Sequence, residues 1–357
     1  MIQTVTELPT EKRHRMRDWM WRQRFERAHG ARSGLWGDGT KVHLMLGVGG
    51  SGIDHLARIV SRPGLQLRFY NALLAKFEPK LILSKTDDRL AVPYQRALDK
   101  YHPLSRIYRM LEESDKEWAG LNISNRPDTS DLSELPCLVK ESHALLATEA
   151  LLKDLKAKAL LYVGDPVKTV DRLLEQQGMH TSYLEVEGRS VLAPRFLSRY
   201  LRRDHVQVMK VHRIIRHATD GRKRTILNKV LVVALIQHMF RLLAARYPEQ
   251  AILVEYERLE KQPELLEEFL TRLMGDKGAT IARKALDAST IVLNGQMNLM
   301  WKYAWPESAP RYAVLTDKEV AQCRRTLSKV GLSQGAEDQG QQPTESAVED
   351  IQGGFLK

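Results

Sequence analysis

The sequence predicts an α/β protein in which a central parallel sheet is flanked by helices. Short apolar strand candidates alternate with helical segments along most of the chain, which is the pattern of parallel strands joined by crossing helices. One strand candidate, 42–46, leads into a glycine-rich stretch at 47–52 and then into a helical pattern at 53–60. The composition agrees with a folded protein, because 43% of the residues are hydrophobic and 28% are charged.

The remaining elements follow from the same periodicity. Further strand candidates lie at 80–84, 137–140, 159–163 and 251–254. Helices are predicted at 11–28, 145–155, 167–176, 226–247, 263–273 and 317–330. The long helix 226–247 is followed by Pro248, which cannot continue a helix.

The chain divides by composition into three parts. Its 357 residues admit two domains or one large α/β domain, and the continuous alternation of strands and helices favours one domain over 37–333. Residues 1–36 are predicted to form a basic N-terminal helical extension, and 334–357 a disordered acidic tail. Within the domain, 86–135 and 177–224 are expected to be excursions of helix and loop.

The cysteines and the apolar runs predict a cytoplasmic protein. Cys137 and Cys323 are too few for a disulfide framework, which indicates a reducing compartment. The N-terminus lacks the apolar core of a signal peptide. The longest uninterrupted apolar run, 230–236, is much shorter than the ~20 residues of a spanning helix, so no transmembrane segment is expected.

The net charge of +11 is concentrated in two segments. Residues 12–32 contain eight cations against two acids, and 195–224 contain ten cations against Asp204 and Asp220. Such clusters indicate an anionic partner. Nucleic-acid binding rests on charge alone and is disfavoured, whereas peripheral contact of helix 11–28 with a membrane remains open.

The stretch 47–52 has several interpretations, of which a plain tight turn is the simplest. A glycine-rich turn between strand and helix exposes backbone N–H groups that can wrap a phosphate. For an ATP-type P-loop, Gly47 and Gly52 have the required spacing, but Ile53 stands at the lysine position and Asp54 at the metal-binding hydroxyl. This interpretation is therefore disfavoured.

A dinucleotide-binding fingerprint is the second functional interpretation. Gly47, Gly49 and Gly52 match its glycines. The fingerprint needs an acidic residue about 20 positions later, and residues 67–71 contain none. A loop that binds a 5′-phosphosulfate is the third interpretation, and motifs elsewhere in the chain favour it.

Five motifs follow one another in a definite order. They are GVGGSGID at 47–54, LVKESH at 138–143, LYVGDP at 161–166, LVEYERL at 253–259 and LTDKE at 315–319. In order and spacing they resemble the sulfotransferase superfamily, whose sulfuryl donor is 3′-phosphoadenosine 5′-phosphosulfate (PAPS). The resemblance covers about 41–331. It implies a P-loop-like sulfotransferase fold, PAPS as donor substrate and no metal.

The resemblance also implies which residues bind the donor. In the loop these are Gly47, Gly49, Gly50, Ser51, Gly52, Ile53 and Asp54. Gly50 replaces the family's cation, Ile53 and Asp54 replace two hydroxyl donors, and Gly164 replaces the arginine that holds the 3′-phosphate. Arg172, eight residues after Gly164, stands where the family has serine and could restore that contact, the alternative being a solvated arginine.

Three residues are candidates for catalysis. Sulfuryl transfer needs a base for the acceptor proton and a cation for the leaving phosphate. His143 is the natural base, because histidine ionises near neutral pH, and Glu141 is the substitute. Lys140 could neutralise the leaving group. The alternative for His143 is a helix-cap or surface role.

The predicted function is sulfuryl transfer from PAPS to a hydroxyl or amine of a carbohydrate, lipid or other metabolite. The basic stretch 195–224 falls where the family has acceptor-gating elements, which suggests an anionic small-molecule or glycan acceptor. The alternative is a catalytically degenerate sulfotransferase-fold protein that serves in binding or as a scaffold. The substitutions at Gly50, Asp54 and Gly164 favour this alternative.

Overall fold

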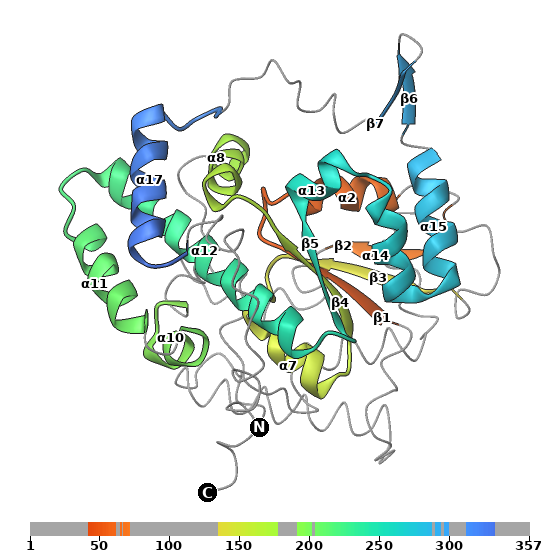
Figure 1. The fold of residues 1–357 in the computed structure, drawn as a ribbon, viewed down its shortest axis with the longest axis horizontal. Coiled ribbons are helices and arrows are strands. Elements are labelled where there is room, and N and C mark those ends of the chain that lie inside the picture. Colours follow the sequence, from red (N-terminus) through yellow and green to blue (C-terminus); the bar gives the residue numbers. More distant parts are fainter. Residues whose placement is uncertain are drawn as a thin grey trace, which may run out of the picture.

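The computed structural model confirms the α/β class with a parallel sheet flanked by helices (Figure 1). It describes residues 42–61, 65, 67–71, 135–177, 191–201, 204–287, 290–293, 296–299 and 312–332. The predicted extension 1–36, the strand candidate 80–84 and the tail 334–357 lie outside the described residues.

Five parallel strands form the central sheet. They are β1 (Val42–Leu46), β2 (Arg68–Asn71), β3 (Cys137–Glu141), β4 (Lys158–Val163) and β5 (Ala251–Glu255). The order is β2-β3-β1-β4-β5, so β1 lies between β3 and β4. In register, Leu46 pairs with Glu141 on one side and with Leu161 on the other. A separate antiparallel pair, β6 (Thr290–Leu293) and β7 (Gln296–Leu299), was not predicted, and neither was β2.

Helices cover both faces of the sheet and enclose two apolar cores. One face packs against α2 (Ile53–Val60), α14 (Leu265–Met274) and α15 (Asp276–Asp287). The other packs against α7 (Thr148–Asp154), α8 (Pro166–Gln177), α10 (Pro194–Tyr200), α11 (His205–Arg216), α12 (Gly221–Arg246) and α17 (Asp317–Lys329). The short helices η3 (Leu145–Ala147) and α13 (Tyr256–Lys261) follow β3 and β5. In β1, Leu44 and Leu46 enter one core and Met45 the other, because side chains alternate along a strand.

The middle of the central helix α12 is enclosed by the fold, while both of its ends are exposed. By length and composition it could cross a membrane, the only such helix among the described residues. However, 78% of its most apolar window is buried against the rest of the protein, as expected for a core helix. Its burial against α8, β4 and β5 explains the long apolar run in the sequence.

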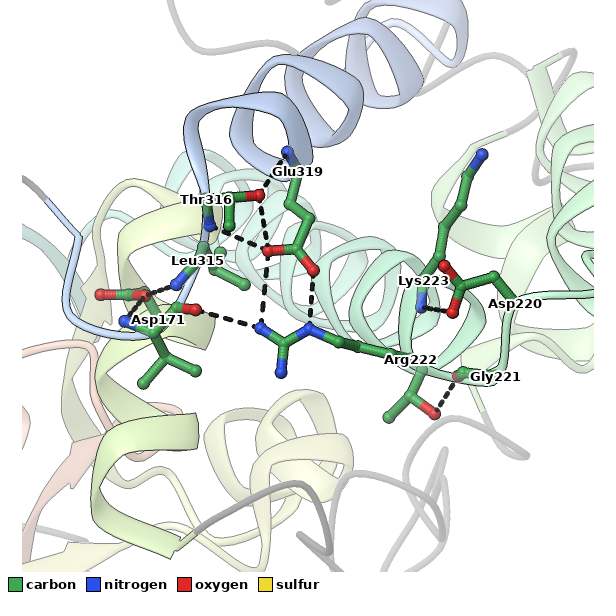
Figure 2. A network of polar contacts seen from close by, with 10 residues as sticks. Asp171, Asp220, Gly221, Arg222, Lys223, Leu315, Thr316 and Glu319 are labelled. Atoms are coloured by element: carbon green, nitrogen blue, oxygen red, sulfur yellow. Dashed lines mark hydrogen bonds and ion pairs between the residues drawn. The ribbon is translucent and has the colours of Figure 1, made fainter.

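The segment that leads into α17 is fixed to α8 by a buried carboxylate (Figure 2). Asp171 accepts hydrogen bonds from the backbone N–H groups of Ala313, Val314 and Leu315 at 2.7, 2.9 and 2.8 Å. The helix itself begins with a capping box between Thr316 and Glu319. Because Asp171 adjoins Arg172, α8 connects α17 to the glycine-rich loop.

The strand order defines a reversal point at the carboxyl ends of the parallel strands. The chain passes from β1 through α2 to β2 on one side, and from β4 through α8 towards β5 on the other. Since α2 and α8 lie on opposite faces, the strand order reverses between β1 and β4. In open α/β sheets, ligands bind outside the carboxyl ends of the strands at this point.

Candidate functional site

The loop 47–52 connects β1 to α2 at the reversal point. Gly50 and Gly52 have φ angles of 77° and 95°, in the left-handed region that favours glycine. The Ser51 N–H donates to the Val48 carbonyl at 3.0 Å, which closes the turn. No side chain caps α2. Its first N–H groups can therefore donate hydrogen bonds to an anion, and the helix dipole favours negative charge at this end.

The loop lies so close to its neighbours that a side chain on Gly47, Gly50 or Gly52 would collide with them. A Cβ on Gly47 would lie 2.7 Å from the Cβ atom of Tyr162. A Cβ on Gly50 would lie 2.6 Å from the Thr169 carbonyl oxygen of α8, and one on Gly52 would lie 1.9 Å from the Tyr256 ring. These contacts give a physical reason for Gly50 where the resemblance implies a cation. Ile53 is fully buried, so that only its backbone can face a ligand.

Lys140 and Asp54 form an ion pair beside the loop. Lys140 ends the apolar part of β3 and is only 8% exposed, while Asp54 lies in the first turn of α2. A carboxylate thus stands where the resemblance implies a hydroxyl, and it neutralises Lys140, the cation that the resemblance implies for the leaving phosphate. The pair also satisfies a lysine that would be costly to bury alone.

Glu141 and His143 form a second pair immediately after Lys140. The Glu141 Oε1 atom accepts the backbone N–H of His143 at 2.9 Å and lies 3.1 Å from its Nδ1 atom. Glu141 is fully buried, whereas 15% of the His143 side chain is exposed. A carboxylate beside Nδ1 favours the tautomer with the proton on that nitrogen. In this tautomer Nε2 is the basic nitrogen.

Arg172 faces the loop from α8. Its Nη1 atom lies 3.4 Å from the Gly50 carbonyl oxygen, and its Cζ atom lies 4.8 Å from the centre of the Tyr256 ring. A guanidinium over an aromatic face is a favourable cation–π arrangement. Burial, with added repulsion from Arg58 and Arg172, lowers the pKa of His55 in the same corner. The Arg172 side chain is half-buried.

The environment of Gly164 is acidic. A Cβ on Gly164 would lie 3.3 Å from Oε1 of Glu257, and the same oxygen accepts the N–H of Asp165 at 2.8 Å. Asp165 in turn binds Arg324 of α17, with 2.6 Å between Oδ2 and Nη2. Where the resemblance implies an arginine, the chain therefore has a glycine beside a carboxylate.

Three buried hydroxyl groups, on residues that belong to the loop or contact it, have no hydrogen-bond partner in the part of the chain that the structure describes. They belong to Ser51, Tyr162 and Thr169. Ser51 Oγ and Tyr162 Cβ both lie beside Gly47, and Thr169 contacts Gly50. Tyr162 and Thr169 approach the loop with a Cβ atom and a backbone carbonyl oxygen, so Ser51 is the residue whose hydroxyl itself lies at the loop. Because buried hydroxyls are normally hydrogen-bonded, a ligand bound at the loop could use the Ser51 hydroxyl.

Sequence reasoning missed several residues of this corner, above all Tyr256, Glu257 and Arg324. Tyr256 and Glu257 directly follow β5 within the fourth motif, so their place at the carboxyl edge of the sheet was predictable. The pKa of Tyr256 is raised to about 12, mainly by burial. Arg324 carried no signal in the sequence, because it enters from the last helix.

The topology brings the predicted residues to one edge of the sheet. The loop, Lys140 to His143, and Gly164 follow the neighbouring strands β1, β3 and β4, and Arg172 reaches the loop from α8. Among the residues that the structure describes, no group of three or more His, Cys, Asp or Glu side chains could hold a metal ion. No protein-family model matches the chain, and no curated protein matches its sequence.

Proposed function

We propose that the protein is a sulfotransferase that moves a sulfuryl group from PAPS to a hydroxyl or amine of a carbohydrate, lipid or other metabolite. The Glu141–His143 pair carries this proposal. It holds a basic nitrogen at the carboxyl end of β3, next to the strand that leads into the glycine-rich loop. A base beside an anion-binding helix end is what transfer of a charged group to a hydroxyl requires.

The residues would divide the chemistry as follows. The N–H groups at the start of α2 and the buried Ser51 hydroxyl bind the 5′-phosphosulfate. His143 Nε2 takes the proton of the acceptor hydroxyl while the acceptor oxygen bonds to sulfur and the bond from sulfur to the bridging phosphate oxygen breaks. Lys140 stabilises the negative charge left on that oxygen. Adenosine 3′,5′-bisphosphate leaves, and Arg172, which faces the loop from α8, is the residue assigned to its 3′-phosphate.

A second candidate function is supported by the two carboxylates of the site. Asp54 is ion-paired with Lys140 of β3, and Glu257 lies beside Gly164. Like charges within about 4 Å repel by roughly 1–4 kcal/mol near a protein surface. Both carboxylates therefore weaken a PAPS site and favour a sulfotransferase-fold protein that binds a partner without catalysis.

Calorimetry with adenosine 3′,5′-bisphosphate tests the donor site. We expect saturable binding that Arg172→Ala weakens about tenfold, as for loss of a charge-assisted contact. Arg195→Ala, an exposed arginine on α10, is the matched control and should leave the affinity unchanged. Absence of heat at saturating ligand would overturn the donor site.

Transfer of radiolabelled sulfate from PAPS to extracted metabolites then separates the two functions. The enzyme predicts labelled product, with His143→Ala lowering the rate by roughly 10²-fold or more while bisphosphate binding persists. Binding without transfer in the wild-type protein would favour the non-catalytic function instead.

A further inference from the structure

The outer face of α11 combines exposed apolar side chains with positive charge. Every large hydrophobic residue exposed in the described part of the chain lies on this helix. They are Val206, Met209 and Ile214, which are 49%, 40% and 71% exposed. Scattered exposed apolar residues are ordinary, but three on one short helix form a patch that calls for a partner. The opposite side of α11 is buried through Val208, Val211 and Ile215.

The cations of α11 lie on the same side as its exposed apolar residues. Helical spacing puts Lys210, Arg213 and Arg216 between Val206, Met209 and Ile214, and all six side chains are exposed. Neither Lys210, Arg213 nor Arg216 forms an ion pair within the described residues, and α11 contains no acid. Cations near the C-terminus of a helix interact favourably with the helix dipole. This interaction does not explain Lys210, which lies in the middle of α11, or the exposed apolar side chains.

We propose that the acidic segment 334–357 of the same chain docks on this outer face of α11. The segment carries five acids against one cation, Lys357. The acids are Glu337, Asp338, Glu345, Glu349 and Asp350. Apolar residues are interspersed with them or follow them, namely Val348, Ile351, Phe355 and Leu356. The segment therefore offers both kinds of side chain that the face of α11 lacks as partners.

Segment 334–357 follows helix α17, which lies beside the proposed docking face of α11. Helix α17 contacts α11 and lies next to it in Figure 1. The described chain reaches Leu332, whose N–H bonds back to Leu327 of α17 at 3.0 Å. Glu345 lies thirteen positions after Leu332 in the sequence, and an extended chain of this length can span roughly 40 Å. Since twelve helical residues span about 18 Å, the acids can reach any part of α11.

The covalent attachment of segment 334–357 to the chain distinguishes it from other ligands that could bind the face of α11. A segment attached next to its site acts at a high effective concentration, so that a few weak contacts suffice. An anionic membrane or a nucleic acid would meet the same cations without that advantage. The docking would keep the basic face covered in the isolated protein.

Photo-cross-linking in the full-length chain tests the docking. With Ile214→p-benzoylphenylalanine, we expect intramolecular cross-links to peptides of 334–357. The same photoreactive residue at the exposed Lys284 of α15 is the control and should give none. Lys210→Glu with Arg213→Glu should lower the cross-link yield about fivefold, as for the loss of two tethered ion pairs. Adding Glu345→Lys and Glu349→Lys should restore it, which a folding defect cannot imitate.

Each other occupant predicts a different result. Cross-links that join two chains and increase with protein concentration would identify a second copy and overturn the proposal. Absence of tail cross-links would overturn it as well. If phosphatidylserine vesicles or a DNA duplex then bound the wild-type chain and not the Lys210→Glu, Arg213→Glu variant, the face of α11 would be assigned to that ligand. The outcome does not depend on whether the protein transfers sulfate.

Discussion

The Lys140 ammonium group and the Asp54 carboxylate are ion-paired, which joins the carboxyl end of β3 to the first turn of α2. The two residues are 86 positions apart in the sequence. A carboxylate at the start of a helix is favoured by the helix dipole. The same carboxylate competes with any phosphate for Lys140 and for the N-terminus of α2. The pair therefore opposes the binding of an anion at the loop 47–52.

Asp54→Asn should strengthen anion binding and weaken the ligand-free fold. Removing the competing charge is expected to raise the affinity for adenosine 3′,5′-bisphosphate about tenfold. The unfolding free energy should fall by about 1–2 kcal/mol, because Lys140 loses its partner while Asp54 is one-third exposed and screened. Calorimetry and denaturant titration measure the two effects. Glu268→Gln on the exposed side of α14 is the control, and a lower affinity would contradict the prediction.

Gly50→Lys should not restore the cation that the sulfotransferase resemblance implies. The residue has a φ of 77°, and its Cβ would lie 2.6 Å from the Thr169 carbonyl oxygen. We expect the unfolding free energy to fall by about 2 kcal/mol or more, from the backbone conformation and the displacement of α8. Gly275→Lys, at a φ of 66° with open space around it, isolates the conformational part and should cost less. Equal losses of unfolding free energy in the two variants would contradict the prediction, because they would show that α8 moves aside without measurable cost.

His43 should make the fold less stable in acid. Burial, with added repulsion from Lys158, lowers its pKa to about 4, whereas an unfolded histidine titrates near 6.5. The unfolded state thus binds the extra proton first, and stability decreases as the pH falls from about 6.5 to 4. The loss from this one group is about 3 kcal/mol.

His43→Leu is the variant that measures this contribution. The decrease in unfolding free energy between pH 7 and pH 4 should become smaller by about 3 kcal/mol than in the wild type. His217→Leu, an exchange at an exposed position, is the matched control. If both variants retained the wild-type pH dependence, His43 would not be the group responsible.

Asp171→Asn should loosen the junction between α8 and α17 shown in Figure 2. The carboxylate accepts three backbone N–H bonds and is only 4% exposed. Losing its charge and part of its acceptor capacity should cost about 2–3 kcal/mol of unfolding free energy. Hydrogen exchange at 313–315 should accelerate in the variant.

The neighbouring ion pair provides the comparison for Asp171. Arg222 binds Glu319 at 2.8 Å, but nearly half of its side chain is exposed. Arg222→Ala should therefore cost less than about 1 kcal/mol. An effect of Arg222→Ala as large as that of Asp171→Asn would place the main anchor of α17 at the surface pair.

The elements that the sequence predicted well are those with strong local signals. Strands β1, β3, β4 and β5 are apolar runs, and the loop 47–52 is marked by glycines between a strand and a helix. Strand β2 was not predicted, because Arg68 and Asn71 interrupt its apolar pattern. Its parallel pairing with β3 holds this segment in the extended conformation. Local patterning cannot detect strands that are stabilised mainly by their neighbours.

The sequence by itself determined the α/β class, the main helices and strands, and the stretches that meet at the carboxyl ends of the strands. Only the tertiary structure decided what those residues contact. It paired Asp54 with Lys140, put Glu257 beside Gly164 and directed Arg172 towards Gly50. Periodicity reports burial along one segment, whereas these contacts join segments that meet only when the parallel sheet aligns its carboxyl ends.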